Sequence, residues 1–503
     1  MNREKTVSLH SRYNPQAEAE RYVNKLSLSE KTRYYILIEP GLGYIVEPLK
    51  KKAPEAKIIS LHVEKPANYQ SSAEAAALSD YSDGISIWYP ETGITLLKFL
   101  EEKIPESEAL KIQILEWRPA LAVYGKAYLT LVEEAAYFIK CSCANVRTVA
   151  AFGARWFRNF FKNLDFLKEA LYPTQGFPLS LPLLVTGAGP GLEGVIPKIK
   201  EEHCKRRIFI LAASSSLMAL EAQGIIPDMV ISTDGSLWAR FHLYGLFRGR
   251  NGKVCLAASL TATLPSQCGS LPVLVISDGS LWQKLVLEGL KIPFVALPQR
   301  GTVTATALDL AFSLTGQKLF ISGMDLVNQD IRSHARPYSF DRFVFESSGR
   351  MNPQYSQTYK RSSLLKTGGS YGVYASWFEK QLPLYPRHLY PIGNNNPVFG
   401  PPETGNFEGL LIPEQAKGNN VNTKAGDEKL PENFKTVKLN FNGRPSEKAF
   451  HILERALNDP AYKTELGQEL SSQLLPNQKT ATPGDLIETI RSRLGFVPGR
   501  KNG

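Results

Sequence analysis

The sequence predicts an α/β protein whose central domain is built on a mostly parallel sheet. Between about residues 181 and 330, short apolar runs alternate with segments of helical spacing. The apolar runs are continuous, as in strands that helices cover on both faces. Nearly every run is followed by Gly, Ser, Thr or Asp. Because 503 residues exceed one ordinary core, we expect an N-terminal α/β domain and a C-terminal helical region to flank this sheet.

The composition limits the class of protein. Apolar content of 43% and charged content of 21% are typical of soluble globular chains. The start, MNREKTVSLHSRYNPQ, has no apolar stretch of a secretory signal, and no run approaches 18 apolar residues. We therefore expect no signal and no membrane span. The net charge of +11 favours anionic partners such as nucleotides or acidic sugars, although a generally basic surface would explain it as well.

The five cysteines form an odd set without a disulfide framework. Cys141 and Cys143 lack a second Cys/His pair at zinc-finger spacing, so no metal site is expected there. This cysteine usage fits a reducing cytoplasm.

The N-terminal domain, residues 1–140, begins with a Rossmann-like β-α-β pattern. A strand at 34–38 leads into a turn with Gly41 and Gly43, and a short helix precedes a second strand at 57–63. Glu64 follows that strand, where an acidic residue accepts ribose hydroxyls in dinucleotide sites. A cofactor half-site and a purely structural unit both remain open. Further strands are predicted at 85–89 and 112–117.

Residues 124–170 have helical spacing, with aromatic side chains at i, i+4 positions. Such a stripe is typical of a core or an interdomain contact. We place a helical connector at 141–180 between the first two domains.

The central domain is predicted at 181–400. Its strands are predicted at 183–185, 207–211, 229–233, 254–257, 273–276, 294–297 and 319–322. Its helices are predicted at 191–202, 217–223, 280–288 and 304–314.

Small and polar residues follow six of these strands. Ligands of parallel sheets bind outside the carboxyl ends of the strands, where hydroxyls and amides can meet phosphate and ribose. The sequence therefore predicts a nucleotide cleft at this edge. The six segments are 186–191, 212–216, 232–235, 277–280, 298–302 and 322–325.

The remaining chain departs from this alternation. Residues 331–380 are rich in Arg, Lys, Tyr and Ser, and are predicted to form a lid over the cleft or a solvated insertion. Residues 401–445 read as a linker because of their Asn, Gly and Pro content. Residues 446–503 return to helical spacing.

Several motifs together resemble those of the motility accessory factor (Maf) family, which modifies flagellin with nonulosonic acids. The most specific are the turn GAGPGL at 187–192, GIIPDMVISTDGS at 224–236 and GTVTATALDLAFSLTGQKLFISGMDL at 301–326. The bridge FGARWFRNFFKNL and the N-terminal EPGLGYIVEPL are also similar. The resemblance implies a sialyltransferase-like, GT-A-like variant of the Rossmann-like sheet. A family of 6-hydroxymethylpterin diphosphokinases shares this central domain. Gly191 stands where the Maf pattern has Ser.

The resemblance implies a glycosyltransferase that moves a nonulosonic acid from a CMP-activated donor to Ser or Thr hydroxyls of flagellin. His334 is the candidate general base or acid, because an imidazole titrates near neutral pH. Asp325 is expected to hold ribose or to order its loop. No cofactor is expected, and metal dependence is left open. The residues expected to bind the donor are Gly187, Gly189, Pro190, Gly191, Ser214, Ser215, Asp234, Gly301, Thr302, Thr304, Arg336 and Tyr338.

Two other functions remain open. A pterin diphosphokinase would use the same turn with ATP and Mg²⁺, for which Asp234, Asp278 and Asp325 are the available carboxylates. A non-enzymatic flagellin-binding protein would need no ordered cleft. No nucleic-acid-binding module is recognisable, so nucleic acid is not an expected partner. The sequence leaves the oligomeric state undetermined.

Overall fold

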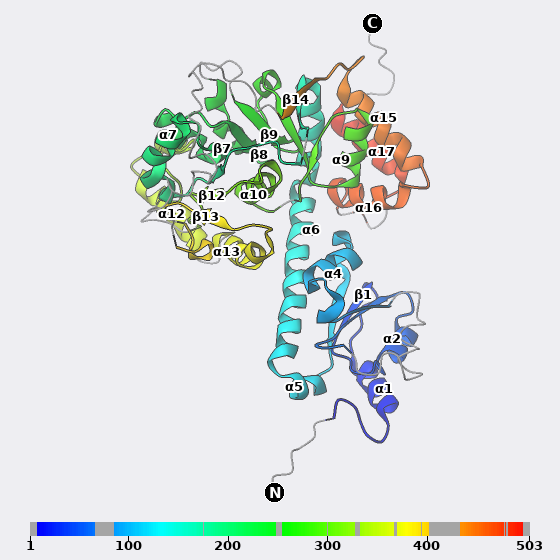
Figure 1. The fold of residues 1–503 in the computed structure, drawn as a ribbon. Helices are drawn as coiled ribbons and strands as arrows, with labels where there is room; N and C mark the ends of the chain where they lie inside the picture. The colour runs from blue at the N-terminus through cyan, green and yellow to red at the C-terminus, as the bar shows by residue number, and fades with distance from the viewer. Residues whose placement is uncertain are drawn as a thin grey trace. The chain divides into compact units, whose positions relative to one another are not determined.

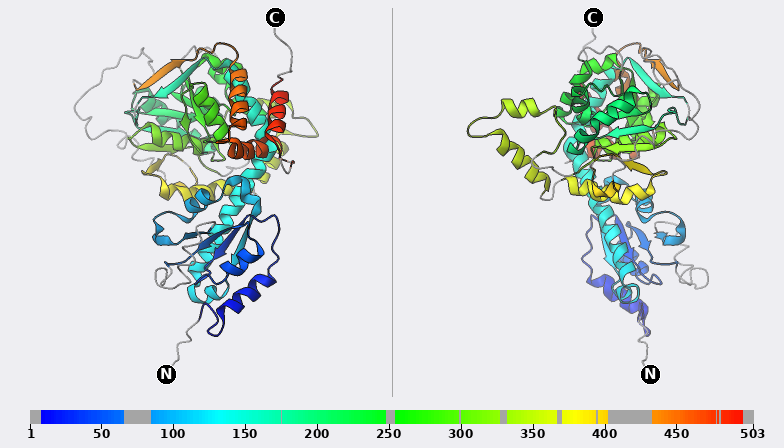
Figure 2. Two further views of the ribbon diagram at one scale, coloured as in Figure 1. Left: turned by 90° about the vertical axis from the view of Figure 1, so that its right-hand side faces the viewer. Right: turned by 60° about the vertical axis from the view of Figure 1, so that its left-hand side comes forward.

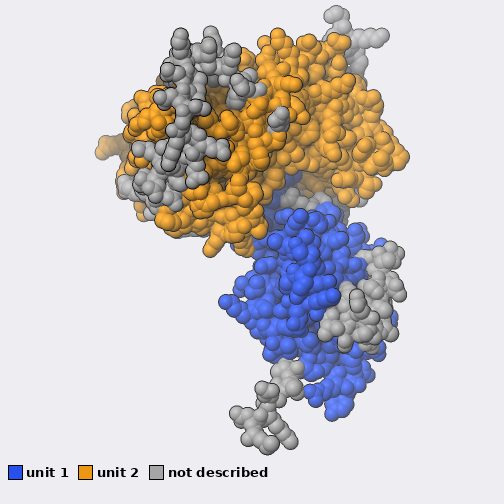
Figure 3. Space-filling model, viewed as in Figure 1, with its two compact units in different colours: residues 1–151 blue, residues 152–503 orange. Residues whose placement is uncertain are grey.

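A computed structural model of the chain contains two compact units, residues 1–151 (unit 1) and 152–503 (unit 2), shown in Figure 3. Within the described residues, no helix is long and apolar enough to cross a membrane. The structure describes residues 8–65, 85–174, 176–247, 254–298, 300–326, 332–366, 370–393, 395–401, 433–476, 478 and 481–495.

Unit 1 is an α/β unit with a parallel sheet in the order β3-β2-β1-β4. The run YYILI forms the buried central strand β1, and the predicted β-α-β arrangement is confirmed. Asn14 and Thr95 cap the first helical amides of α1 and α4. The elements are α1 (Pro15–Lys25), β1 (Tyr34–Ile38), α2 (Val46–Lys52), β2 (Lys57–Leu61), β3 (Ile85–Trp88), η1 (Pro90–Thr92), α4 (Leu96–Lys103), η2 (Glu106–Lys111), β4 (Ile112–Glu116), α5 (Pro119–Tyr124) and α6 (Lys126–Phe166). Helix α6 continues into unit 2.

Unit 2 is built on a sheet in the order β13-β12-β6-β7-β8-β9-β10-β5-β14, with β11 paired to β10. All of these pairings are parallel except that of β14 with β5. The predicted mostly parallel central sheet is therefore confirmed. The strands are β5 (Glu169–Pro173), β6 (Leu183–Thr186), β7 (Phe209–Ala213), β8 (Met229–Ser232), β9 (Cys255–Ser259), β10 (Val273–Ser277), β11 (Val295–Ala296), β12 (Leu319–Ser322), β13 (Leu389–Pro391) and β14 (Phe434–Lys438).

Helices cover both faces of this sheet (Figure 1). The α-helices are α7 (Ile196–Cys204), α8 (Leu217–Ala222), α9 (Leu281–Gly289), α10 (Val303–Leu314), α11 (Asp341–Glu346), α12 (Gln354–Lys366), α13 (Ser370–Gln381), α15 (Pro445–Asn458), α16 (Lys463–Leu474) and α17 (Pro483–Leu494). The 3-10 helices are η3 (Pro190–Val195), η4 (Ser214–Ser216), η5 (Leu237–His242), η6 (Tyr244–Phe247), η7 (Ser266–Ser270), η8 (Leu382–Leu384) and η9 (Pro397–Phe399).

Alternate side chains of the strands enter two separate apolar cores of unit 2. Leu184 and Ile210 belong to one core, whereas Leu183, Val185 and Leu211 belong to the other. The first core also contains aromatic side chains from the end of α6 and apolar ones from α15, α16 and α17. The second is completed by α10 and α13. Strands buried on both faces explain why the sequence lacks an apolar–polar alternation here.

Two predicted helices have different bounds in the structure. The helical pattern predicted to reach residue 170 ends at Phe166, and residues 169–173 form β5 inside the large sheet. The helix predicted at 191–202 begins only at Ile196, because the preceding residues form the 3-10 helix η3. Short apolar segments do not distinguish a strand from a buried helix without their tertiary partners.

The compact units also cut the chain differently from the predicted domains. The predicted connector at 141–180 divides into the end of α6 and strand β5. The C-terminal helices belong to unit 2, where α15 and α16 pack against α9. Most of the predicted linker, residues 402–432, lies outside the described residues, and its last part forms β14. Helices α11 and α12, from the predicted lid, project from the body of unit 2 (Figure 2).

Candidate functional site

The glycine turn after β6 lies directly against the residues that follow β12. Gly187 N–H donates to Ser322 O at 2.8 Å, and Gly189 N–H donates to Gly323 O at 2.7 Å. A Cβ atom on Gly187 would overlap the Gly323 carbonyl, and one on Gly189 would overlap the Asp325 carboxylate. The strand order changes direction between β6 and β12, so this is the position where doubly wound sheets place their ligand crevice. Here the glycines permit the turn after β6 and the segment after β12 to approach each other closely.

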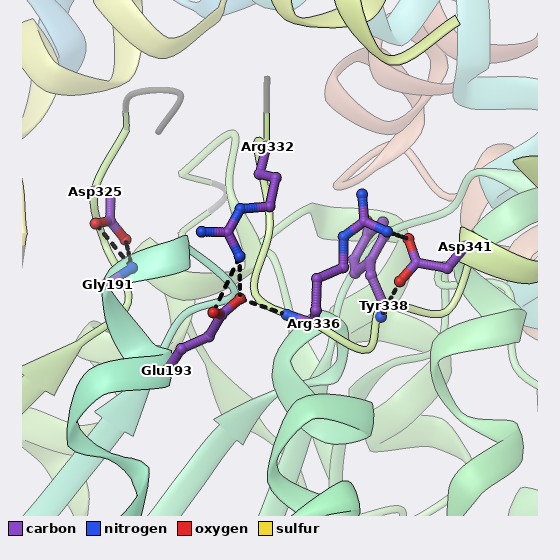
Figure 4. A network of polar contacts seen from close by, with 7 residues as sticks. All are labelled: Gly191, Glu193, Asp325, Arg332, Arg336, Tyr338 and Asp341. Carbon is purple, nitrogen blue, oxygen red and sulfur yellow. Dashed lines mark hydrogen bonds and ion pairs between the residues drawn. The ribbon is translucent and has the colours of Figure 1, made fainter. Parts of the chain in front are cut away.

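Asp325 supplies an anionic group to this turn. Both of its carboxylate oxygens accept from Gly191 N–H at 3.0 Å (Figure 4). The side chain is 2% exposed, and burial raises its pKa to about 6 although the Gly191 bond opposes the shift. Asp325 thus contacts the main chain of the glycine turn, and its expected role at the site stays a prediction. Because Gly191 already has an acceptor, the role of this turn in donor binding stays a prediction.

Glu193 joins the glycine turn to the segment 332–341, which we call the rim segment. Its carboxylate accepts from Arg332 Nη1 at 3.1 Å and from Arg336 N–H at 2.8 Å (Figure 4). Ala335 N–H also donates to Ala188 O at 2.7 Å. These bonds hold both ends of the five-residue stretch 332–336, which contains His334, against the turn.

His334 is fixed by contacts within the rim segment. Its Nδ1 lies 2.8 Å from Ser333 Oγ, and its ring stacks on Tyr338 with centroids 4.1 Å apart. Arg336 pairs with Asp341 at 2.7 Å, and the other carboxylate oxygen of Asp341 accepts from Tyr338 N–H. Local contacts thus set the orientation of the His334 ring and the position of the neighbouring Arg336 guanidinium. Figure 4 shows the Arg336–Asp341 pair.

A pocket of about 550 Å³ opens beside the rim segment. It brings together four of the predicted site residues, Asp234, His334, Arg336 and Tyr338. Aromatic side chains form another part of its wall, and Trp238 lies 5.1 Å from Phe343 between ring centroids. The lining residues are Asp234, Ser236, Trp238, His242, Ser333, His334, Arg336, Tyr338, Phe340, Asp341, Phe343, Val344, Gln357 and Thr358. The pocket thus offers charged and hydroxyl groups on one side and flat apolar surfaces on the other.

The other predicted donor-binding residues lie at the same carboxyl edge of the sheet but outside the pocket lining. Ser214 and Ser215 form η4 directly after β7, and Ser214 is buried. Pro190 begins η3 in the glycine turn.

The start of α10 carries three more of the predicted residues. Thr302 caps α10 by accepting from Ala305 N–H at 3.0 Å, Thr304 is buried, and Gly301 precedes them with φ +73°. A Cβ on Gly301 would lie 3.6 Å from the ring of Tyr374 in α13. Because Tyr371 in that helix donates to Ser333 O at 3.3 Å, α13 links the start of α10 to the rim segment.

Sequence reasoning missed several side chains that build this site. Glu193 and Asp341 anchor the rim segment, and His242 contacts Ser339 Oγ at 2.9 Å. Trp238 follows the polar end of β8 by six residues and Phe343 sits in α11. Glu193 directly follows the glycine turn 187–192, so its carboxylate was a visible signal. The others depend on tertiary contacts that no sequence spacing reveals.

Comparisons with known proteins bear on the central part of unit 2. Residues 155–330 match the model of the family described as 6-hydroxymethylpterin diphosphokinase MptE-like. An uncharacterized protein of Treponema pallidum (strain Nichols) is 28% identical over 290 residues, which cover 57% of this chain and 61% of the relative. The chain therefore matches less than two thirds of that relative's length.

Among solved structures, the chain resembles a MAf glycosyltransferase from Magnetospirillum magneticum AMB-1. The TM-score is 0.47 at 12% identity, and the alignment covers 95% of this chain and 77% of that one. The family match covers the glycine turn, the polar end of β8, and strand β12 with the Asp325 that follows it. Residues 155–330 of this chain are therefore similar to the MptE-like family.

Proposed function

We propose that unit 2 is a glycosyltransferase that moves a nonulosonic acid from a CMP-activated donor to Ser or Thr hydroxyls of flagellin. The observation that carries this proposal is the pocket in which His334 stands beside Arg336, Tyr338 and Asp234. The sequence resemblance to the Maf family supports the donor and the acceptor. The MptE-like match to residues 155–330 supports a domain that binds a phosphorylated compound.

His334 is the residue proposed to move the proton. The acceptor hydroxyl oxygen forms a bond to the anomeric carbon of the sugar while the bond from that carbon to the phosphate oxygen breaks. The bonding electron pair leaves with CMP, and the hydroxyl proton passes to the imidazole of His334. Ser333 and Tyr338 hold the ring in one orientation, which a general base needs.

Arg336 and Tyr338 are proposed to receive the charge of the departing phosphate. Arg336 is paired with Asp341 in this structure, so the pair carries little net charge. A phosphate in the pocket would compete with Asp341 for the guanidinium.

The aromatic wall is proposed to contact the base and the sugar ring. Trp238 is 48% exposed and Phe343 is 54% exposed, both at the pocket. Flat apolar surfaces of this kind stack on rings with little loss of hydrogen bonds. The remaining donor contacts are proposed for Ser214, Ser215, Thr302 and Thr304.

A second candidate, ATP-dependent pyrophosphoryl transfer to a pterin, is favoured by the name of the matching family. It requires carboxylates that hold Mg²⁺. In the part of the chain that the structure describes, no group of three or more His, Cys, Asp or Glu side chains could hold a metal ion. Asp234, Asp278 and Asp325 thus do not form such a group with one another.

The first experiment separates these two enzymes by ligand preference. The purified full chain is heated with CMP, CDP or ATP plus Mg²⁺, and the midpoint of unfolding is recorded. We expect the two cytidine nucleotides to raise it, since a ligand at 100 times its Kd adds about 2.7 kcal/mol. Stabilisation of the unit 2 transition by ATP alone would contradict the glycosyltransferase and support the kinase.

The second experiment tests the reaction itself. Intact masses of flagellin are compared between cells that carry the wild-type chain and cells that carry His334→Ala. We expect the variant to retain CMP stabilisation and to lose the added mass. His451→Ala, which changes an exposed histidine of α15, is the matched control and should leave the mass unchanged.

The same experiment separates a non-enzymatic flagellin-binding protein from an enzyme. For a binding protein, flagellin would co-purify with the chain but its mass would not depend on the chain or on His334. A substitution in the glycine turn, such as Gly189→Asp, would not serve as a test of binding or catalysis. A Cβ at this position overlaps the Asp325 carboxylate and would disturb the fold. We place the reaction in the cytoplasm, as the cysteine content of the sequence suggests.

A further inference from the structure

Unit 1 holds one of its own histidines where parallel sheets bind ligands. The strand order β3-β2-β1-β4 changes direction between β1 and β4, so the general ligand position lies at the carboxyl ends of these two strands. The turn at residues 39–43 follows β1, and Trp117 follows β4. His10, from the segment before α1, lies between them.

The imidazole of His10 makes one directed bond and two ring contacts. Leu42 N–H donates to His10 Nε2 at 3.0 Å. The ring centroid lies 5.0 Å from that of Tyr44, edge to face, and 5.5 Å from that of Trp117. A Cβ on Gly41 would overlap the imidazole, so the glycine is required for the ring to enter. The position therefore fits a flat ring with a nitrogen acceptor in its plane.

His10 does not satisfy this position completely. Burial lowers the pKa of His10, so the ring is neutral at pH 7 and Nε2 can accept. The proton of the neutral ring is then on Nδ1, a buried atom with no partner among the described residues. An unsatisfied buried donor costs free energy. A ligand ring without that donor would therefore compete well for the same place.

Two acidic residues, Glu39 and Glu64, follow β1 and β2 at the same edge of the sheet. Glu39 is 3% exposed with φ +45°, and its carboxylate accepts from Val63 N–H at 2.7 Å. A buried residue in the left-handed region is strained, and such strain concentrates at functional sites. Glu64, after β2, accepts from Tyr124 O–H at 3.1 Å. Carboxylates at the end of the strand next to β1 are the acceptors that ribose hydroxyls meet in sheets of this order.

We propose that Leu42 N–H, Tyr44 and Trp117 form a binding site for a nucleoside, and that His10 is an internal occupant which the base displaces. The base stacks on Trp117 and accepts from Leu42 N–H in place of Nε2. The ribose lies toward Glu64. This site is in unit 1 and is independent of the reaction proposed for unit 2.

The experiment measures adenosine binding to the full chain by titration calorimetry. His10→Ala vacates the position and should bind adenosine at least about tenfold more tightly than wild type, a difference of about 1.4 kcal/mol. Tyr13→Ala is the matched control, because this side chain of the same segment is 99% exposed. It should bind as wild type does. Free imidazole should compete with adenosine for the His10→Ala variant.

Further variants locate the site and guard against misfolding. Adding Trp117→Ala to His10→Ala should abolish the gained affinity. Adding Glu64→Gln should weaken adenosine more than free adenine, since only adenosine carries the ribose. If His10→Ala loses the wild-type circular dichroism spectrum, His10→Gln, which removes the ring but keeps an acceptor, takes its place. Equal adenosine affinity of wild type and the folded variant, or binding by neither, would overturn the proposal.

Discussion

At the scale of single residues, Glu193 connects the glycine turn to the chemistry proposed for the rim segment. Its carboxylate accepts from Arg332 and from the main chain of Arg336, on either side of His334. The bonds among Glu193, Arg336 and Asp341 link the residue after the glycine turn to the rim segment (Figure 4). Glu193 is therefore a positioning residue, and its effect should appear in the rate of transfer more than in binding.

Glu193→Gln tests this role. The amide can still accept from Arg336 N–H, but the ion pair with Arg332 is lost. We expect transfer to fall about tenfold, because small displacements of a catalytic group are costly, with CMP affinity unchanged within about twofold. Stability should change by about 1 kcal/mol or less, since the pair is partly exposed. Glu346→Gln, which breaks an exposed pair with Arg342, should leave the rate unchanged. Equal losses in rate and CMP affinity would contradict a positioning role.

Asp325 gives a prediction about pH. Its pKa is raised from 3.8 to about 6, so between these values the folded protein holds a proton that the unfolded chain has released. This contribution to stability is present below pH 3.8 and is lost as the pH rises to about 6. Asp325→Asn has no such proton, so its stability relative to wild type should increase by about 2–3 kcal/mol between pH 4 and pH 7. Denaturant unfolding at several pH values measures this difference in the free energy of unfolding. For the control Glu55→Gln, at an exposed position, the difference from wild type should not change with pH.

At the scale of elements, the C-terminal helices complete the amino end of α9. Trp282 N–H in the first turn of α9 donates to Glu469 Oε2 of α16 at 3.3 Å. Burial and the nearby Asp278 raise the pKa of Glu469 to about 8. This contact explains how a region that reads as a separate helical segment becomes part of unit 2.

Glu469→Gln should therefore stabilise the protein more at high pH than at low pH. Between pH 4.5 and about 8 the folded state holds a proton that the unfolded state lacks, so wild type loses stability as the pH rises through that window. We expect the midpoint of thermal unfolding of the variant to exceed that of wild type by about 2 °C or more at pH 8.5 and by less at pH 5. Glu488→Gln, at an exposed position of α17, serves as the control. If the unfolding midpoints of Glu469→Gln and wild type differed by the same amount at every pH, the raised pKa of Glu469 would not be the cause.

The strands that sequence reasoning found and missed differ in their surroundings. Runs such as LLVT at β6 and VLVIS at β10 are apolar throughout, because both faces of the sheet are covered. Residues 169–173, EALYP, carry a mixed pattern beside a long helix, and they form β5 only through pairing with β10 and β14. Their periodicity could not have predicted a strand.

At the scale of the whole molecule, each compact unit has a core of its own. The apolar cluster of unit 1 extends from α1 to the first half of α6, whereas the two clusters of unit 2 begin at Phe157 and at Leu171. The unit 1 cluster packs on the four-stranded sheet, and the two unit 2 clusters lie on the two faces of the larger sheet. Units with separate cores fold as separate cooperative systems.

A fragment of residues 1–151 should therefore fold without unit 2. We expect it to give the circular dichroism of an α/β protein, a cooperative thermal transition and no stabilisation by CMP. The full chain should show more than one transition, of which CMP shifts only that of unit 2. A fragment that remains unfolded, with a single transition for the full chain, would contradict independent units.

The sequence by itself determined the α/β class, the mostly parallel sheet and the edge at which a site would lie. It did so because continuous apolar strands and polar strand ends are local patterns. Only the tertiary structure decided which side chains meet at that edge. It brought Glu193 to Arg332 across 139 residues, placed Asp325 on Gly191, and put His10 on the turn of unit 1. Contacts between residues so far apart in the sequence depend on how the chain packs around its cores, which no local pattern encodes.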